Sequence, residues 1–405
     1  MIVSFADVVA AQERIRGAVD VTPCPESLPL SELCGSRVFC KLEYLQRTGS
    51  FKERGARNAL VRLDTERRQR GVIAASAGNH ALALACHGGQ LGIPVTVVMP
   101  KFAPLIKQTR CRRQGAHVIL HGETFGEAKA KADELAAQSG FTYVHGYDDP
   151  DIIAGQGTLG LEILAQVPEA DAVVIPIGGA GLIAGVSLVL KHCRPEIEVI
   201  GVEPENAANY SAALAAGMPI KIAMRPTLAD GLAVGQVGTH AFAIARQNVD
   251  RVVKVTESDL SLAIVRLMEL EKSVVEGAGA ASLAAILHQR LPHLNGKRVV
   301  LCLCGGNIDL AIVSRLIETG LVADGRLTRF TAIISDRPGG LARFAQIIAD
   351  VGAGIKEITH DRAFSGPDVS AVNVLCTVET RDHEHSRELF DQLRKEHIEH
   401  FEHGR

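Results

Sequence analysis

From Val72 to about Leu316, short apolar runs rich in β-branched residues alternate with Ala- and Leu-rich stretches of helical period. Strands that are apolar at nearly every position are typical of parallel sheets covered on both faces by helices. The pattern therefore predicts an α/β fold. The expected strands are Val72–Ala75, Val95–Met99, Val118–His121, Ala172–Pro176, Val199–Glu203 and Val299–Leu303. The expected helices include His80–Leu91, Phe125–Ser139, Leu182–His192 and Ala278–Gln289.

The pattern changes near residue 320, where Gly320–Arg326 is a polar, glycine-bearing link. Beyond it the periodicity predicts strand, helix, strand, strand and helix, which is the order of a small α+β module. We therefore expect one large domain at 1–320, with a smaller subdomain inserted at about 48–150, and a second domain at 328–405. The expected elements of the second domain are Phe330–Ser335, Leu341–Val351, Ile355–Arg362, Val369–Val378 and His383–Lys395.

Composition excludes several classes of partner. A net charge of −3 gives no general attraction to nucleic acid or to an anionic membrane. Aromatic residues are only 4% of the chain and tryptophan is absent, so platforms for base stacking are not expected. No run of ~18 uncharged apolar residues is present to span a bilayer. The nine cysteines are scattered, and residues 1–17 form an amphipathic pattern rather than a signal peptide. We expect a cytoplasmic protein with reduced thiols.

Glycine-containing turns follow three of the expected strands, at 76–80, 178–181 and 305–307. Ligands of open α/β sheets lie beyond the carboxyl ends of the strands. The turn Gly178-Gly179-Ala180-Gly181 precedes a helix, and its N–H groups and helix dipole favour a bound phosphate. Taken alone, Gly179-x-Gly181-x-x-Ala184 with Glu203 on the next strand favours a dinucleotide. A purely structural role for the glycines stays open.

Lys52 lies in the run Ser50-Phe51-Lys52-Glu53-Arg54-Gly55-Ala56, just before an expected helix. A lone lysine is usually a solvated surface charge. A lysine that forms a Schiff base must instead be partly desolvated, so that its amine can be neutral and nucleophilic. Phe51 and the apolar stretch 56–60 would supply such surroundings. Spacing alone does not decide between these interpretations.

Four motifs in order make the chain resemble the threonine dehydratase and serine racemase family, whose members are fold-type-II pyridoxal-phosphate enzymes with two parallel-sheet α/β subdomains. They are the Lys52 run, Ser76-Ala77-Gly78-Asn79-His80, Gly178-Gly179-Ala180-Gly181-Leu182 and Cys304-Gly305-Gly306-Asn307. The resemblance implies that Lys52 carries the cofactor covalently, with Phe51 beside it, and that the 178–182 loop holds the cofactor phosphate. It also implies that Asn79 contacts the ring hydroxyl and Cys304 the pyridine nitrogen. The backbone of Ser76, Ala77, Gly78, Asn79 and His80 would bind the substrate carboxylate.

Two positions depart from the family pattern. Ala180 replaces a glycine, which we expect to be tolerated if the backbone there is not at positive φ. Cys304 stands where serine is common, and a neutral thiol would not hold the pyridine nitrogen protonated. This limits the electron sink and favours β-elimination. Without the resemblance, Cys304 is interpreted as a small buried hydrophobic residue.

Ala77 distinguishes reactions within the family. Racemases resemble Ser-Ser-Gly-Asn-His, where the second serine is the acid/base opposite the lysine, and alanine has no group for that role. We therefore expect β-elimination from a small hydroxy amino acid, L-threonine before L-serine, to a 2-oxo acid and ammonia. The alternatives are a serine racemase or threo-3-hydroxyaspartate ammonia-lyase of the same fold, an NAD-dependent oxidoreductase, and a non-catalytic amino-acid sensor.

A cation site is a further expectation from the resemblance. The segment Glu203-Pro204-Glu205-Asn206-Ala207 matches the family pattern, which implies Glu203, Ala207 and Asn209 as ligands of a monovalent or divalent cation. Asn209 replaces an acidic ligand, and its neutral oxygen is a weaker donor for a hard cation. The alternative for Glu203 is an ordinary solvated carboxylate.

The C-terminal module resembles an ACT domain, in which an amino-acid effector lies at the turn before the first helix, here Asp336–Leu341. Pairing of such modules implies a homodimer or homotetramer. Only the polar segment His397–His403 remains for a closing strand. Its spaced histidines, His397, His400 and His403, suggest either a metal or, with better support, a solvated face.

Overall fold

The computed structural model describes residues 2–287, 290–362 and 370–403. The chain forms two compact units that divide between Ile308 and Asp309. This division lies before the boundary expected near residue 320, and helix α14 (Leu310–Ala323) falls in the second unit. Gln289 and Val369, which end and begin two expected elements, lie outside the described residues.

The first unit contains a six-stranded sheet in the order β1-β2-β10-β7-β8-β9. Its neighbouring strands are parallel except for the antiparallel pair β1–β2. The central strand β7 is buried at every position, as the apolar pattern predicts. The strands are β1 (Glu26–Ser27), β2 (Arg37–Lys41), β7 (Ala172–Pro176), β8 (Glu198–Pro204), β9 (Arg251–Val255) and β10 (Arg298–Cys302).

Helices pack around this sheet, and their apolar faces form its core with β7 and β8. Helix α1 (Phe5–Ile15) is shorter than the expected 1–17 and begins at a capping box made by Ser4 and Asp7. The longer helices are α8 (Pro150–Gln166), α9 (Gly181–Cys193), α11 (Thr239–Asn248), α12 (Glu257–Leu270) and α13 (Gly277–Ile286). The shorter ones are α2 (Leu28–Cys34), α10 (Asn209–Ala216) and the 3-10 turns Glu43–Leu45, Glu205–Ala207, Asp230–Leu232 and Pro292–Leu294.

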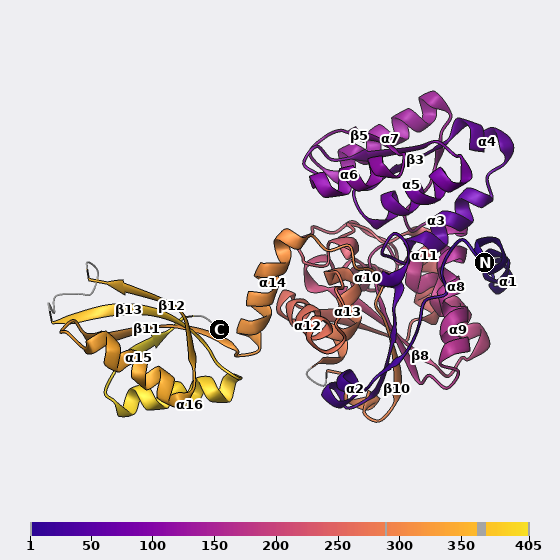
Figure 1. The fold of residues 1–405 in the computed structure, drawn as a ribbon. Helices are drawn as coiled ribbons and strands as arrows, with labels where there is room; N and C mark the ends of the chain where they lie inside the picture. The colour runs from indigo at the N-terminus through magenta and orange to yellow at the C-terminus, as the bar shows by residue number, and fades with distance from the viewer. Residues whose placement is uncertain (1, 288–289, 363–369, 404–405) are drawn as a thin grey trace. The chain divides into compact units, whose positions relative to one another are not determined.

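A second, four-stranded parallel sheet of this unit has the order β5-β4-β3-β6. Together with its helices it forms the small subdomain, which has its own apolar core (Figure 1). The strands are β3 (Val72–Ala75), β4 (Val95–Met99), β5 (His117–Leu120) and β6 (Thr142–Tyr143). The helices are α3 (Lys52–Val61), α4 (Thr65–Arg70), α5 (Asn79–Leu91), α6 (Leu105–Arg113) and α7 (Phe125–Ser139).

The second unit is an antiparallel sheet in the order β12-β13-β11-β14, with two helices on one face (Figure 1). The polar C-terminal segment does form the closing strand, which pairs with β11. The resulting βαββαβ order confirms the expected small α+β module. Its elements are β11 (Leu327–Ser335), α15 (Gly340–Val351), β12 (Gly354–Asp361), β13 (Ala371–Glu379), α16 (His383–Lys395) and β14 (Glu399–Glu402).

The six expected strands of the first unit are present, each within one residue of its expected ends. The apolar pattern does not predict β2 or β9, whose sequences contain charged residues, or the two-residue strands β1 and β6. No helix within the described residues has both the length and the apolar character to cross a membrane. The carboxyl ends of β3, β7 and β10 lead into the three glycine-containing turns, and the candidate site is built there.

Candidate active site

Lys52 is the first residue of α3, and the segment before it is anchored to the end of β10. Ser50 forms a β-bridge with Gly305, and the backbone N–H of Phe51 donates to the carbonyl oxygen of Cys304 at 3.1 Å. These contacts join two motifs that are about 250 positions apart in the sequence. The tertiary structure therefore places Lys52 and Cys304 in one site.

The Lys52 amine lies in partly desolvated surroundings. Its Nζ donates to the carbonyl oxygen of Gly146 at 2.6 Å and lies 5.2 Å from the centre of the Phe51 ring. Burial lowers the pKa of Lys52 to about 8, because removal from water disfavours the charged ammonium. The neutral fraction of this amine near neutral pH is therefore much larger than that of an ordinary lysine, as a nucleophile or general base requires.

The loop after β7 presents a series of free backbone donors. Residues 178–182 are buried, yet among the described residues nothing accepts a hydrogen bond from their five N–H groups. Buried N–H groups are nearly always paired, and here they lie at the N-terminus of α9. The loop Gly178, Gly179, Ala180, Gly181 and Leu182 therefore fits a bound anion, and the cofactor phosphate has the required charge and acceptors.

Tyr147 packs against this loop and connects it to Lys52, whose partner Gly146 is the preceding residue. A Cβ at Gly179 would lie 2.1 Å from the Tyr147 ring, and one at Gly181 would lie 2.4 Å from the Tyr147 carbonyl oxygen. Only glycine permits these close approaches. Tyr147 and Gly146 were not among the predicted site residues, since no sequence motif marks them.

Ala180 was expected to be tolerated in this loop if its backbone is not at positive φ, and this condition is not met. Its φ is +71°, in the left-handed region, so the expectation of an ordinary backbone at this position is wrong. An alanine in this region costs about 1–2 kcal/mol relative to an unstrained conformation. The buried loop and the start of α9 hold the residue in this conformation.

Two substitutions in this loop are expected to act in opposite directions. Gly179→Ala should lower the amount of bound pyridoxal phosphate, because its methyl group collides with Tyr147 and displaces the loop. Ala180→Gly should keep the cofactor and raise the free energy of unfolding by about 1 kcal/mol through relief of the left-handed alanine. Cofactor absorbance and urea unfolding measure the two effects. Equal cofactor content in Gly179→Ala and the unsubstituted protein would contradict the first prediction.

Asn79 begins α5 and makes hydrogen bonds with two residues that the sequence did not mark as site residues. Its Nδ2 donates to Glu276 Oε1 at 2.6 Å, and its Oδ1 accepts from Asn307 Nδ2 at 2.9 Å. Glu276 is buried, and burial, followed by repulsion from Asp230, raises the pKa of its carboxyl to about 7. Asn307 belongs to a recognised motif, but Glu276 has no local sequence signal.

The loop at 76–80 offers a second group of backbone donors. Among the described residues, no acceptor receives a hydrogen bond from the N–H groups of Ala77, Asn79 and His80. The N–H of Ser76 is used by the carbonyl of Val98, and that of Gly78 by the Ser76 hydroxyl. Three of the five predicted residues, Ala77, Asn79 and His80, therefore have a backbone N–H group that is free to bind the substrate carboxylate. The His80 ring faces the Val144 carbonyl, and burial lowers its pKa to about 3, so it is neutral.

Cys304 is a buried neutral thiol at the end of β10. Its Sγ donates to the carbonyl oxygen of Cys302 at 3.2 Å, and burial raises its pKa well above the ordinary value. A neutral thiol at a pyridine nitrogen offers no negative charge to keep that nitrogen protonated. The surroundings of Cys304 therefore agree with the expectation that its thiol is neutral.

The predicted cation ligands lie together but are largely engaged. Glu203 is fully buried, and its carboxylate accepts from the N–H groups of Tyr210 and Ser211 at the start of α10. The alternative of a solvated carboxylate is therefore wrong. Asn209 donates to the Val234 carbonyl, while its Oδ1 is buried without a partner. Ala207 is buried beside them. Cation binding stays a prediction, and the described residues contain no cluster of three His, Cys, Asp or Glu ligands.

A buried ion-pair network lies behind α3. The Arg54 guanidinium makes paired hydrogen bonds to Glu43 at 2.7 Å and to Glu162 at 2.6 and 2.9 Å, and Lys41 donates to Glu162 at 2.6 Å. The four side chains have at most 8% exposure. They join α3, which begins with Lys52, to α8 and to the end of β2. The network therefore fixes the position of the helix that carries the site lysine.

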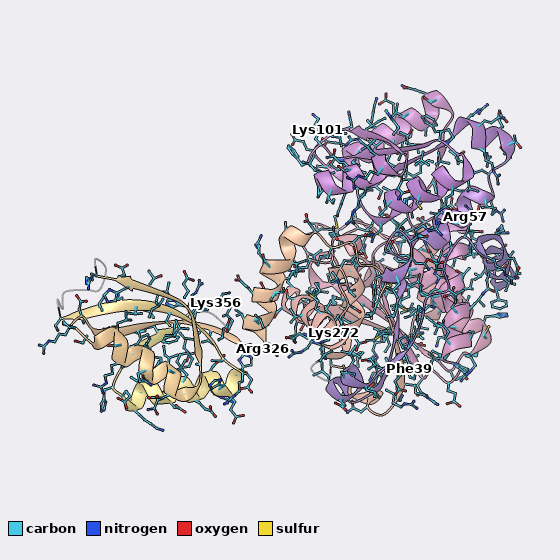
Figure 2. The ribbon with its side chains drawn as sticks, in the orientation of Figure 1. Phe39, Arg57, Lys101, Lys272, Arg326 and Lys356 are labelled. Atoms are coloured by element: carbon cyan, nitrogen blue, oxygen red, sulfur yellow. The ribbon has the colours of Figure 1, made fainter. Side chains whose placement is uncertain are left out.

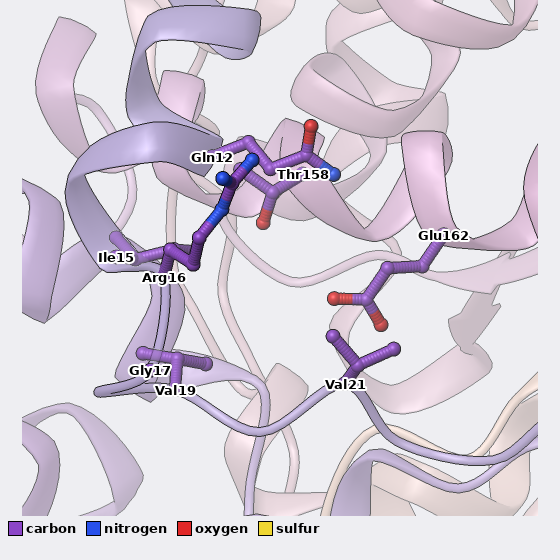
Figure 3. A pocket seen from close by; sticks show the side chains of 8 residues that line it. All are labelled: Gln12, Ile15, Arg16, Gly17, Val19, Val21, Thr158 and Glu162. Atoms are coloured by element: carbon purple, nitrogen blue, oxygen red, sulfur yellow. The ribbon is translucent and has the colours of Figure 1, made fainter.

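A cavity of about 170 Å³ opens beside Glu162 (Figure 3). None of its lining residues belongs to the predicted site. They are Gln12, Ile15, Arg16, Gly17, Val19, Val21, Thr158 and Glu162.

Comparison with known proteins gives a family for this arrangement. Residues 15–305 match the family model described as pyridoxal-phosphate dependent enzyme. The L-threonine ammonia-lyase of Thermotoga maritima is 41% identical over 387 residues, which cover 96% of each chain. Threonine deaminase isoform 2 of Solanum lycopersicum, in its processed form, superposes with a TM-score of 0.74 at 36% identity, over 78% of this chain and 91% of its own.

Maize serine racemase superposes with a TM-score of 0.75 at 33% identity, over 80% of this chain and 99% of its own. The common fold confirms the expected fold-type-II architecture of the first unit. The dinucleotide interpretation of the 178–181 loop is set aside, since Glu203 caps α10 and is not free to bind a ribose. The chain belongs to the family of pyridoxal-phosphate-dependent enzymes, and pyridoxal phosphate is its cofactor.

Proposed function

We propose that this enzyme is a threonine ammonia-lyase, which converts L-threonine, and L-serine less well, to a 2-oxo acid and ammonia. The observation that carries the proposal is the asymmetry of the site. Lys52 supplies an amine with a pKa of about 8, whereas position 77 is an alanine without any proton-exchanging group. The names of relatives with similar sequences agree with this reaction.

The proposed cofactor contacts combine the free backbone donors of the 178–182 loop with the roles that the family resemblance implies for Asn79, Cys304 and Lys52. The N–H groups of residues 178–182 would hold the phosphate, Asn79 the ring hydroxyl and Cys304 the pyridine nitrogen. Lys52, beside Phe51, would carry the cofactor. When bound, pyridoxal phosphate supplies an electron sink for the electrons released at the substrate Cα. The neutral Cys304 limits this sink, which favours rapid loss of the β-hydroxyl over a long-lived carbanion.

The protein's own residues then orient the substrate and move its proton. The N–H groups of Ala77, Asn79 and His80 would bind the substrate carboxylate, which fixes the direction of the Cα–H bond. The freed Lys52 amine would remove this proton as the general base. Because Ala77 cannot return a proton from the opposite face, elimination is favoured over racemisation.

A substrate panel tests the proposed reaction. With L-threonine, L-serine and threo-3-hydroxyaspartate supplied separately, we expect the fastest release of 2-oxo acid from L-threonine and slower release from L-serine. Racemisation of L-serine, measured by chiral chromatography, should be slow relative to elimination. Faster conversion to D-serine than to pyruvate would identify a racemase instead, and preferred use of hydroxyaspartate would identify the other alternative.

We propose in addition that the second unit is an ACT-like regulatory module. Its βαββαβ order supports this, as does the turn before α15, where Gly339 adopts a left-handed φ of +92° and Asp336 pairs with Arg362. An amino-acid effector would bind at this turn, and paired modules would give a homodimer or homotetramer. His397, His400 and His403 belong to no metal-ligand cluster of the described residues. The nine free cysteines agree with the cytoplasmic location, which stays a prediction.

A further inference from the structure

The side chain of Asn79 is held from two sides. An ionised carboxylate accepts hydrogen bonds only, so the contact with Glu276 fixes the NH2 end of the Asn79 carboxamide. The donation from Asn307 fixes the oxygen end. Asn307 is itself anchored, since its Nδ2 also donates to the Thr48 carbonyl and its Oδ1 accepts from Arg110. The orientation of Asn79 is therefore set by its neighbours, and one of its two N–H bonds remains for a ligand.

The Glu276 side chain packs closely against the backbone of Gly305. It is 6% exposed, and a Cβ at Gly305 would lie 2.2 Å from its Oε1, so only glycine permits this position. The backbone N–H of Glu276 donates to the Gly305 carbonyl at 3.0 Å. Gly305 follows Cys304, which contacts the segment before Lys52. The carboxylate thus lies among the groups assigned to the cofactor.

Charged groups face Glu276 from several elements. Asp230, on the 3-10 turn at 230–232, opposes its ionisation, and Lys107 on α6 favours it. These two residues form an ion pair at 2.7 Å on the surface. The charge of Glu276 also acts on Lys52 and on Cys304. Burial is the largest cause, and together with these charges it raises the pKa of the Glu276 carboxyl to about 7, so its ionisation changes within the working range of an enzyme.

We propose that Glu276 is a positioning residue that acts on the cofactor through Asn79, and that its ionisation controls the hydrogen bond from Asn79 to the cofactor ring hydroxyl. Ionised Glu276 holds the Asn79 NH2 group firmly, with one N–H directed to the ring. When Glu276 takes up a proton from solvent, it accepts more weakly and its new O–H competes as a donor, so Asn79 is released. The inference rests on the proposed placement of Asn79 at that hydroxyl.

The visible absorbance of the holoenzyme reports this contact without turnover, because the absorbance depends on the ring hydroxyl and its hydrogen bonds. The spectrum should be recorded as the pH is varied through about 7. We expect a spectral transition in the unsubstituted protein, its loss in Glu276→Gln, and its retention with a shifted midpoint in Glu276→Asp. Identical titration curves for Glu276→Gln and the unsubstituted holoenzyme would overturn the proposal.

Surface substitutions provide an independent test that does not alter Glu276. Asp230→Asn should move the midpoint of the transition to lower pH, because a charge that opposes ionisation is removed. Lys107→Ala should move it to higher pH. Lys101→Ala is the matched control, an exposed lysine of the same subdomain, and should leave the midpoint unchanged (Figure 2). If Glu276→Gln does not fold, these shifts of the midpoint test the proposal instead. Equal midpoints in Asp230→Asn, Lys107→Ala and Lys101→Ala would contradict it.

Asn79→Ala separates this inference from the site assignment on which it rests. If Asn79→Ala changes the spectrum and Glu276→Gln does not, Asn79 contacts the cofactor but Glu276 has no positioning role. If neither substitution changes the spectrum, the placement of Asn79 at the ring hydroxyl is wrong, and the inference fails with it. The proposed ammonia-lyase reaction is tested separately by the substrate panel.

Discussion

Replacement of Lys52 by alanine is expected to lower the release of 2-oxo acid from L-threonine by about 10³-fold or more. The variant loses both the covalent attachment of the cofactor and the proposed general base. Steady-state assays measure the loss. The visible absorbance of the cofactor should also lose its imine band, which borohydride bleaches in the unsubstituted protein.

Lys101→Ala is the control for Lys52→Ala, because it removes an exposed lysine of the same subdomain. It should retain full activity and an unchanged spectrum. The thermal midpoint of Lys52→Ala should stay close to that of the unsubstituted protein, since among the described residues the Lys52 amine donates a hydrogen bond only to the Gly146 carbonyl. Full activity of Lys52→Ala would disprove the assignment of the catalytic lysine.

Arg54→Ala is expected to lower the free energy of unfolding of the first unit by about 3–5 kcal/mol. The substitution removes the cation that the buried carboxylates of Glu43 and Glu162 share. Glu162 keeps its ion pair with Lys41, whereas Glu43 loses its ion pair with Arg54. Urea unfolding followed by circular dichroism measures the change. Because α3 begins with Lys52, activity should decrease as well, at temperatures where the variant is still folded.

The pH dependence of this effect follows from Glu43. Burial opposes its ionisation, but Arg54 and the hydrogen bonds of the site hold its folded-state pKa below the ordinary 4.5. The folded pKa is depressed, so the stabilisation from this pair is present above pH 4.5 and is lost as the pH falls through the folded pKa. The deficit of Arg54→Ala should therefore be larger at neutral pH than in acid.

Arg67→Ala is the matched control, since Arg67 is 63% exposed and its ion pair with Asp64 lies on the surface. We expect a change of at most about 0.5 kcal/mol in that variant. A loss of less than about 1 kcal/mol in Arg54→Ala would contradict this prediction. It would show that the cost of desolvating these charges offsets most of the stability that the network contributes.

The pattern of apolar residues was sufficient to predict the strands that are buried along their whole length. The mainly apolar runs at 72–75, 95–99 and 172–176 are strands with the expected ends, because each is buried on both faces. The strands β2 and β9 were missed because Arg37, Lys41, Arg251 and Lys254 interrupt their pattern. Lys41 is nevertheless fully buried, since Glu162 from α8 neutralises it. Its partner is 121 positions away, and local sequence contains no sign of it.

The same contrast holds within the site. The sequence pattern marked Lys52, Asn79, the 178–182 loop and Cys304, because each belongs to a compact motif, at the start of a helix for Lys52 and after a strand for the others. It did not mark Glu276, whose role depends on Asn79 and Gly305, residues brought to it by α5 and β10. It also missed the left-handed backbone of Ala180, since φ at a non-glycine residue is set by the contacts around the turn.

The sequence by itself determined the alternation of strands and helices, the two-part organisation and the family motifs, because periodicity and turn chemistry are local properties. Only the tertiary structure decided which groups share a site and how each is charged there. The pKa of Lys52 near 8 and that of Glu276 near 7 come from burial and from charges on other elements. Burial and distance between remote segments are properties of the packed fold, and therefore a motif can name a catalytic lysine but cannot show what positions its partners.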